Sequence, residues 1–129
     1  MTERVSSSVE LALRAYAAFN AEDWDTLQEL FAPDLELQRA GGLGTLHGSE
    51  TVVGFAEPDA FEWQRLEPQG EFIEEGDKVF VALLNRVRGR GSEIEMEQPV
   101  FHVATLRDGR IARIVVHFDR TEALEDLRR

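Results

Sequence analysis

The sequence has no cysteine, which removes disulfide bonds, thiolate nucleophiles and zinc-thiolate sites from consideration. Long apolar runs are also missing, because stretches such as Val79–Leu84 fall far short of the roughly 20 residues that span a bilayer. Basic residues are few, with 14 Lys and Arg against 25 Asp and Glu, so the net charge of −11 opposes contact with a phosphate backbone. We therefore expect neither a membrane protein nor a nucleic-acid partner.

The remaining composition is that of an ordinary globular chain. Its 129 residues, 43% of them hydrophobic, predict one domain over residues 1–129 with a core that needs no metal or staple. The opening MTERVSSSVE has neither the basic stretch nor the apolar segment of a secretory signal, so we expect a cytoplasmic protein.

Two helices are expected near the N-terminus. The first starts at Ser7, because apolar residues follow at the spacing of one helical face. The second is capped by Asp23, extends through Phe31 and is stopped by Pro33. The apolar positions of the two helices are Val9, Ala12, Leu13, Tyr16 and Phe19, and then Trp24, Leu27, Leu30 and Phe31.

Strands dominate the rest of the chain. DLELQRA, residues 34–40, alternates as a strand with one wet side, and a GGLG loop and a short third helix from Ser49 to Pro58 follow. Four longer strands come next, and Asp108-Gly109 joins the last two as a hairpin. A final piece, TEALEDLRR, fits one or two turns of helix or a frayed tail. The strands are Phe61–Ile73, Lys78–Arg88, Glu93–Leu106 and Arg110–Phe118.

Helices followed by long strands predict an α+β fold, with helices on one face of a curved, largely antiparallel sheet. Alternation places His102 on the same face as Ile94, Met96 and Val100, which is the apolar face under the helices. On the next strand His117 has the opposite parity to Phe118, so the two histidines are not expected to meet.

Other polar residues share the inward parity. Arg39 follows Leu35 and Leu37, and Asn85 lies among valines of the second long strand. A buried polar group without a partner costs about 1–3 kcal/mol, so these groups need partners. Either they satisfy one another, together with Tyr16 or Trp63, or they surround a wet pocket in which a ligand supplies the partner.

The stretches RAYAAFNAEDWDTLQELFAPDLEL, HGSETVVGF and GRIARIVVHFD, in this order, resemble the nuclear transport factor 2-like superfamily. That superfamily includes ketosteroid isomerases and SnoaL-type polyketide cyclases, and the resemblance covers nearly the whole chain. It implies a cystatin-like cone in which a curved sheet, wrapped by N-terminal helices, encloses a deep apolar pocket, usually in a homodimer. It implies no fixed chemistry, because this fold serves enzymes, ligand binders and transport factors.

The residues that resemble ketosteroid isomerase differ from it at the decisive positions. Arg39 stands where that enzyme has its aspartate base. The tyrosine of that enzyme falls at Ala15, next to Tyr16, and its protonated aspartate falls at His102. Limonene epoxide hydrolase needs an Asp-Arg-Asp set on the sheet, and in this sequence no acidic residue has the inward parity that would match it. In SnoaL-type cyclases an inward acid or base sits on the late strands, and His102 fits that position.

We therefore expect His102, Arg39 and Tyr16 to form a site for a small, partly apolar molecule, without a metal or cofactor. In one hypothesis the protein is an isomerase, cyclase or dehydratase with His102 as acid and base. In the other it is a non-catalytic binding or interaction module that dimerises through its outer sheet face, with His117 in the interface. The expected ligand-binding residues are Trp24, Phe31, Leu37, Phe55, Trp63, Asn85 and Phe118.

Overall fold

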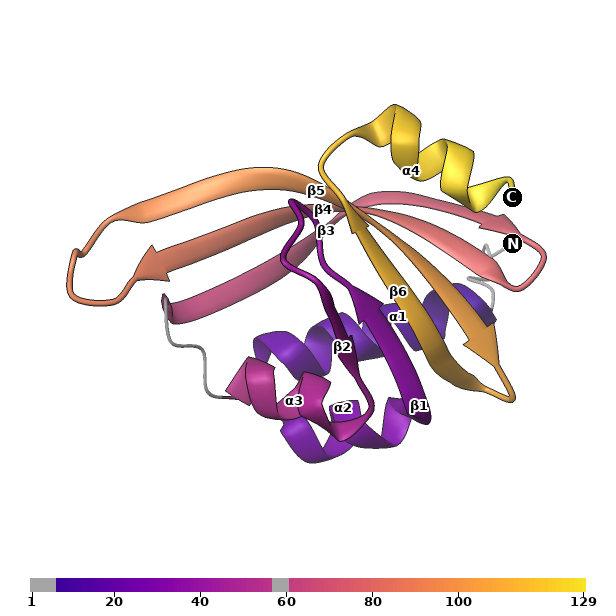
Figure 1. Cartoon of the computed structure of the whole chain (residues 1–129), viewed down its shortest axis with the longest axis horizontal. Coiled ribbons are helices and arrows are strands. Elements are labelled where there is room, and N and C mark those ends of the chain that lie inside the picture. Colours follow the sequence, from indigo (N-terminus) through magenta and orange to yellow (C-terminus); the bar gives the residue numbers. More distant parts are fainter. Residues whose placement is uncertain (1–6, 57–60) are drawn as a thin grey trace, which may run out of the picture.

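The computed structural model describes residues 7–56 and 61–129, and within them the chain forms one mixed sheet of six strands with four helices (Figure 1). The strand order is β2-β1-β6-β5-β4-β3. The elements are α1 Ser7–Asn20, α2 Trp24–Leu30, β1 Phe31–Gln38, β2 Thr45–His47, α3 Ser49–Ala56, β3 Phe61–Glu75, β4 Lys78–Gly89, β5 Glu95–Arg107, β6 Arg110–His117 and α4 Arg120–Leu127.

The sheet is the predicted curved α+β arrangement. The helices α1, α2 and α3 lie on one face and α4 on the other, while one end of the β3–β4–β5 ribbon extends past the helices (Figure 1). Neighbouring strands are antiparallel except for β1 and β6, which run parallel with Gln38 opposite Val115. The fold class and the mixed sheet are thus confirmed.

Local signals explain most of the boundaries. Asp23 caps α2 through its side chain, which accepts from the backbone N–H of Thr26. At the β5–β6 hairpin, Arg107 pairs with Arg110, and the two loop residues Asp108 and Gly109 both have positive φ, as a tight hairpin turn requires. The third helix is described from Ser49 to Ala56, and the stop expected at Pro58 lies outside the described residues.

Three local predictions were wrong. Ile94 and Met96, expected on the apolar face under the helices, are 60% and 57% exposed, and Ile94 precedes the start of β5 at Glu95. Phe31 is the first residue of β1 and not part of the second helix, because its backbone is already extended, with φ −90° and ψ 143°. Pro33 therefore lies inside β1, where the pairing with β6 is irregular between Phe31 and Glu36 and no ladder N–H is required of it. The expected loop before the third helix also contains a short strand, β2.

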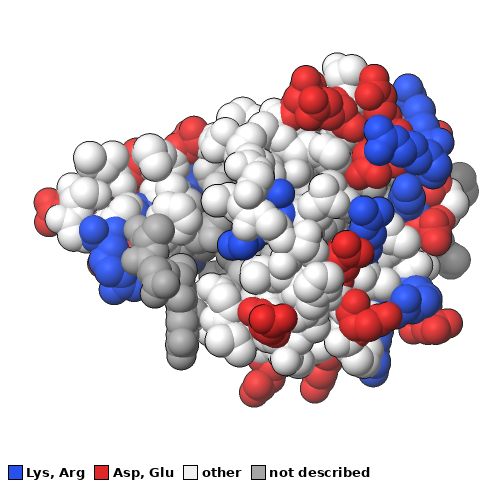
Figure 2. All heavy atoms as spheres, in the orientation of Figure 1, with Lys and Arg blue, Asp and Glu red and all other residues white. Residues whose placement is uncertain are grey.

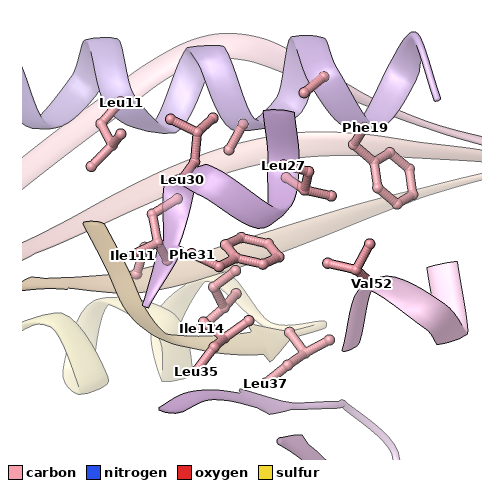
Figure 3. Packing of buried hydrophobic residues seen from close by; sticks show 13 residues of the cluster. Leu11, Phe19, Leu27, Leu30, Phe31, Leu35, Leu37, Val52, Ile111 and Ile114 are labelled. Carbon is pink, nitrogen blue, oxygen red and sulfur yellow. The ribbon is translucent and has the colours of Figure 1, made fainter. Parts of the chain in front are cut away.

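The core is divided by the sheet. Under α1 to α3, apolar side chains from the helices meet those of β1 and β6, as Figure 3 shows for Leu11, Phe19, Leu27 and Ile114. A neighbouring cluster joins α1 to β4 and β5. A third cluster lies on the other face beneath α4, formed by Phe80, Ala82, Val103, Ala123 and Leu127.

Candidate functional site

The centre of the helix-covered face holds a polar pair. Tyr16, from the inner side of α1, places its Oη 2.9 Å from Nδ1 of His102 on β5, and the two rings lie 5.7 Å apart. Tyr16 is 7% exposed and His102 only 6%. The inward direction predicted for His102 is confirmed, and Tyr16 is the partner that a buried imidazole needs.

This pair lines a small interior cavity of about 40 Å³. Three residues predicted to bind a ligand share the lining: Phe31, Leu37 and Phe55. The cavity is far smaller than the roughly 300 Å³ of a usual ligand pocket, so the interior is nearly filled. The remaining lining residues are Ala12, Ala15, Phe19, Leu27, Leu66, Ala104, Ile111 and Ile114.

Tyr16 and His102 are the only lining residues, among those that the structure describes, with polar side chains. Burial lowers the pKa of His102 from 6.5 to about 4, and the nearby His117 lowers it further in the same direction. Burial also raises the pKa of the Tyr16 hydroxyl far above its usual value. Both side chains are consequently neutral at pH 7.

The second ring nitrogen of His102 has a different environment from the first. Nε2 makes no hydrogen bond to a described residue, and it is not fully enclosed. Nε2 is therefore the ring nitrogen that remains available to hydrogen-bond to a ligand.

Two partly exposed residues separate the cavity from solvent. Phe55 on α3 packs edge-on against Phe19 with ring centres 5.1 Å apart, and Leu66 on β3 lies at the same cavity. The side chain of Asn20 fixes the backbone of Leu66, since it donates to Leu66 O and accepts from Leu66 N, both at 2.8 Å. Leu66 is therefore the fixed side of the cavity.

The inward prediction for Arg39 was wrong. The regular strand ends at Gln38, the backbone of Arg39 bonds to Gly44, and the exposed guanidinium donates to the carbonyl oxygens of Leu43 and Gly44. Strand alternation no longer applies to a side chain that folds onto its own loop. Arg39 and His102 therefore do not share a cavity.

The other predicted ligand residues lie outside the interior cavity. Trp24 packs edge-on against Phe19 behind the lining, and Trp63 stacks under the guanidinium of Arg65 on β3. Asn85 accepts a hydrogen bond of 2.8 Å from Gln64, so its partner lies within the sheet. Phe118, after the end of β6, is 51% exposed.

His117 points to the opposite face of the sheet, as predicted, but its partner belongs to the same chain. Its Nε2 lies 2.9 Å from Oδ2 of Asp126 on α4, and Lys78 Nζ lies 3.9 Å from Oδ1. Lys78 also donates to Asp126 O, which fixes the end of α4. The sequence reasoning missed Asp126 and Lys78, although an acidic residue on a terminal amphipathic piece was a usable signal.

This placement changes the expected outer surface. α4 covers the sheet around Phe80 and Phe101, and His117 takes Asp126 of this helix as its partner, so its expected role in a dimer interface stays a prediction. A homodimer stays a prediction, with the free end of the β3–β4–β5 ribbon as the uncovered part of that face.

Among the described residues, no group of three or more His, Asp or Glu side chains is arranged to hold a metal ion. None of the helices described here has the length and apolar content to cross a bilayer.

A family model, the SnoaL-like domain, matches residues 12–114. The chain is similar to an NTF2-like protein of unknown function from Burkholderia pseudomallei, with 28% identity and a TM-score of 0.77 over 94% of this chain and 97% of that one. It is equally similar to TerC, co-crystallised with polyporic acid, with 29% identity and a TM-score of 0.77 over 95% and 98%. A candidate polyketide cyclase from Sinorhizobium meliloti has 25% identity and a TM-score of 0.67 over 88% and 100%. No curated protein matches the sequence.

Proposed function

Because the chain belongs to the SnoaL-like domain family, we propose that it binds a small, mostly apolar organic molecule in the cavity beside Tyr16 and His102. One oxygen of that molecule accepts a hydrogen bond from Nε2 of neutral His102. The observation that carries this proposal is a polar pair, sealed in an apolar cavity, whose outer nitrogen has no protein partner among the described residues. Such a group gains most from a ligand that supplies the missing partner.

Counting donors and acceptors supports this direction of the hydrogen bond. If Tyr16 donates to Nδ1, its own proton is satisfied, and His102 carries its proton on Nε2, facing the cavity. If Nδ1 donates to Tyr16 instead, the tyrosine proton and the Nε2 lone pair are both left without partners. The first arrangement leaves one group unsatisfied and the second leaves two. Nε2 is therefore the donor that the ligand meets.

The same features argue against His102 as the acid and base of an isomerase, cyclase or dehydratase. A pKa of about 4 leaves roughly one imidazole in a thousand protonated at pH 7, so an imidazolium acid is scarce. Nδ1 is occupied by Tyr16, and no carboxylate lines the cavity among the described residues. Binding without proton transfer is the simpler function, in which His102 polarises an oxygen as a neutral donor.

A cavity of about 40 Å³ has room for little more than water, so ligand binding requires the cavity to open. The partly exposed Phe55 and Leu66 mark the route, and Phe55 is the side that moves because Asn20 clamps Leu66. TerC, with 29% identity and nearly full coverage, was co-crystallised with polyporic acid, which supports an organic ligand for this chain as well.

Calorimetric titration with polyporic acid tests this function. We expect saturable binding by the wild type, roughly tenfold weaker binding by His102→Ala because one hydrogen bond is lost, and unchanged binding by His47→Asn. His47 is the matched control because it is an exposed histidine on β2. Equal affinity of the wild type and His102→Ala, or no binding of polyporic acid and of a panel of smaller aromatic ketones, contradicts the proposal.

A further inference from the structure

A second and much larger cavity, about 450 Å³, opens where β1 and β6 end. These two strands are parallel, so the segments that follow them leave the same edge of the sheet side by side. One wall is the loop after β1 with Arg39 and its glycines, and the other is formed by His117, Phe118 and the start of α4. In Figure 2 this middle part of the visible face, over β1 and β2, is largely uncharged, and the acidic groups gather near its rim.

Arg39 is held in place at this cavity by its own loop. The guanidinium donates to the carbonyl oxygens of Leu43 and Gly44, which uses two of its five N–H groups and leaves the others available. Gly44, with φ +89°, lets the backbone turn around the guanidinium, and a Cβ there would stand 3.8 Å from its NH2 nitrogen. The loop therefore holds the guanidinium in place while its other N–H groups remain available to a ligand.

His117 offers the complementary group. Its Nε2 is bonded to the buried carboxylate of Asp126, which fixes the ring and places the proton of a neutral imidazole on Nε2. Nδ1 makes no hydrogen bond to a described residue and is not enclosed. As the imidazole lines the cavity, its free lone pair accepts a hydrogen bond there.

Phe118 provides a flat apolar wall between these polar groups. Half of its surface is exposed, and Gly41 of the facing loop would bring a Cβ within 3.7 Å of the ring. A large aromatic side chain kept at the surface of a hollow with convergent polar groups is typical of a small-molecule site.

We propose that this outer cavity, defined by Arg39, His117 and Phe118, is a second ligand site for a planar aromatic molecule with a hydroxyl group and a carbonyl oxygen. Arg39 donates to the carbonyl oxygen, His117 Nδ1 accepts from the hydroxyl group, and Phe118 covers the ring. Two carboxylates, Asp119 and Glu122, also line the cavity, and the whole chain carries −11, so the ligand is neutral rather than a phosphate or another polyanion.

The site is independent of the function proposed above. His102 and His117 point to opposite faces of the sheet, because His102 pairs with Val116 and His117 with Phe101 on the adjoining strands. The larger hollow of about 490 Å³ at the start of α1 is lined by α1, the end of β5 and nearby turn residues. None of the described residues in its lining is aromatic, and Arg107 there is already paired with Asp34. The outer cavity is thus the one in which oriented groups and adequate volume coincide.

The test uses 7-hydroxycoumarin, a planar probe with a hydroxyl group at one end and a carbonyl group at the other, followed by fluorescence anisotropy. The pH is kept below the pKa of its phenol so that the probe is neutral. We expect saturable binding by the wild type and roughly tenfold weaker binding by Arg39→Gln and by Phe118→Ala. Both side chains are exposed and neither holds α4, so both variants should fold. His117 is kept, because it anchors that helix.

Two variants serve as controls. Arg107→Gln removes an exposed arginine at the end of β5, beside the β5–β6 hairpin and away from the outer cavity. His102→Asn alters only the interior cavity, so both variants should bind the probe as the wild type does. Inorganic phosphate at the same concentration should not displace the probe. The proposal is overturned if the wild type shows no saturable binding up to about 1 mM, if Arg39→Gln and Phe118→Ala bind normally, or if His102→Asn abolishes binding, which would assign the probe to the interior.

Discussion

The buried imidazole of His102 should make the stability of the protein depend on pH in a defined window. Its pKa is about 4 in the folded state against 6.5 in an unfolded chain. As the pH falls below 6.5 the unfolded chain takes up a proton that the folded chain does not, so the folded state loses stability until about pH 4. This stabilising contribution is fully present above pH 6.5.

The magnitude follows from the two pKa values. Between pH 7.5 and pH 5 the linkage amounts to about 2 kcal/mol, which corresponds to roughly 7 °C in Tm for a chain of this length. Urea unfolding at both pH values measures it. Other groups titrate in the same range, so the wild type must be compared with His102→Asn, whose amide oxygen can accept from Tyr16 but does not titrate.

We expect the wild type to lose about 2 kcal/mol more than His102→Asn between pH 7.5 and pH 5. Imidazole nitrogen chemical shifts provide a second measurement, in which His102 stays neutral at pH 5. Parallel losses of stability in the two proteins, together with a His102 signal that titrates near 6.5, would refute the claim that burial keeps this ring neutral.

Three further outcomes are expected in denaturant unfolding. Tyr16→Phe leaves Nδ1 of His102 without its donor and should cost about 1–3 kcal/mol, and a change below about 0.5 kcal/mol would argue against that hydrogen bond. Asp126→Ala removes the buried carboxylate shared by His117 and Lys78, and should cost about 3 kcal/mol and make α4 sensitive to limited proteolysis. Gly44→Ala should destabilise the protein by about 1 kcal/mol because of the positive φ at this position. Gly54→Ala, inside α3 with ordinary contacts, should stabilise it by a few tenths of a kcal/mol or more. Changes in the free energy of unfolding with the same sign for both variants would contradict this reasoning.

The sequence predicted the sheet well because alternation is reliable along a regular ladder. His102 lies in the regular part of the β4–β5 ladder, with Val100 and Ala104 buried on either side of it, and its direction is confirmed. The inward prediction for Arg39 failed because the strand ends one residue earlier, at Gln38, where the antiparallel pairing with Thr45 is followed by a loop. A parity argument holds only as far as the strand itself.

Other features depend on packing in three dimensions, which the sequence does not carry. Phe31 fits the apolar face of a helix and of a strand equally well, and only its neighbours in the fold decide between them. The volume of a cavity likewise depends on how large side chains such as Phe19 and Phe55 interlock. The list of apolar residues was therefore useful for the lining of the cavity but not for its size.

The two histidines on adjoining strands are coupled through the sheet. The pKa of His102 is lowered mainly by burial and additionally by the charge that a protonated His117 carries on the opposite face. The neutral form of His102 is favoured first by desolvation and second by the nearby His117. This is why a hydrogen-bond donor, rather than a proton-transfer group, is the role that the interior site supports.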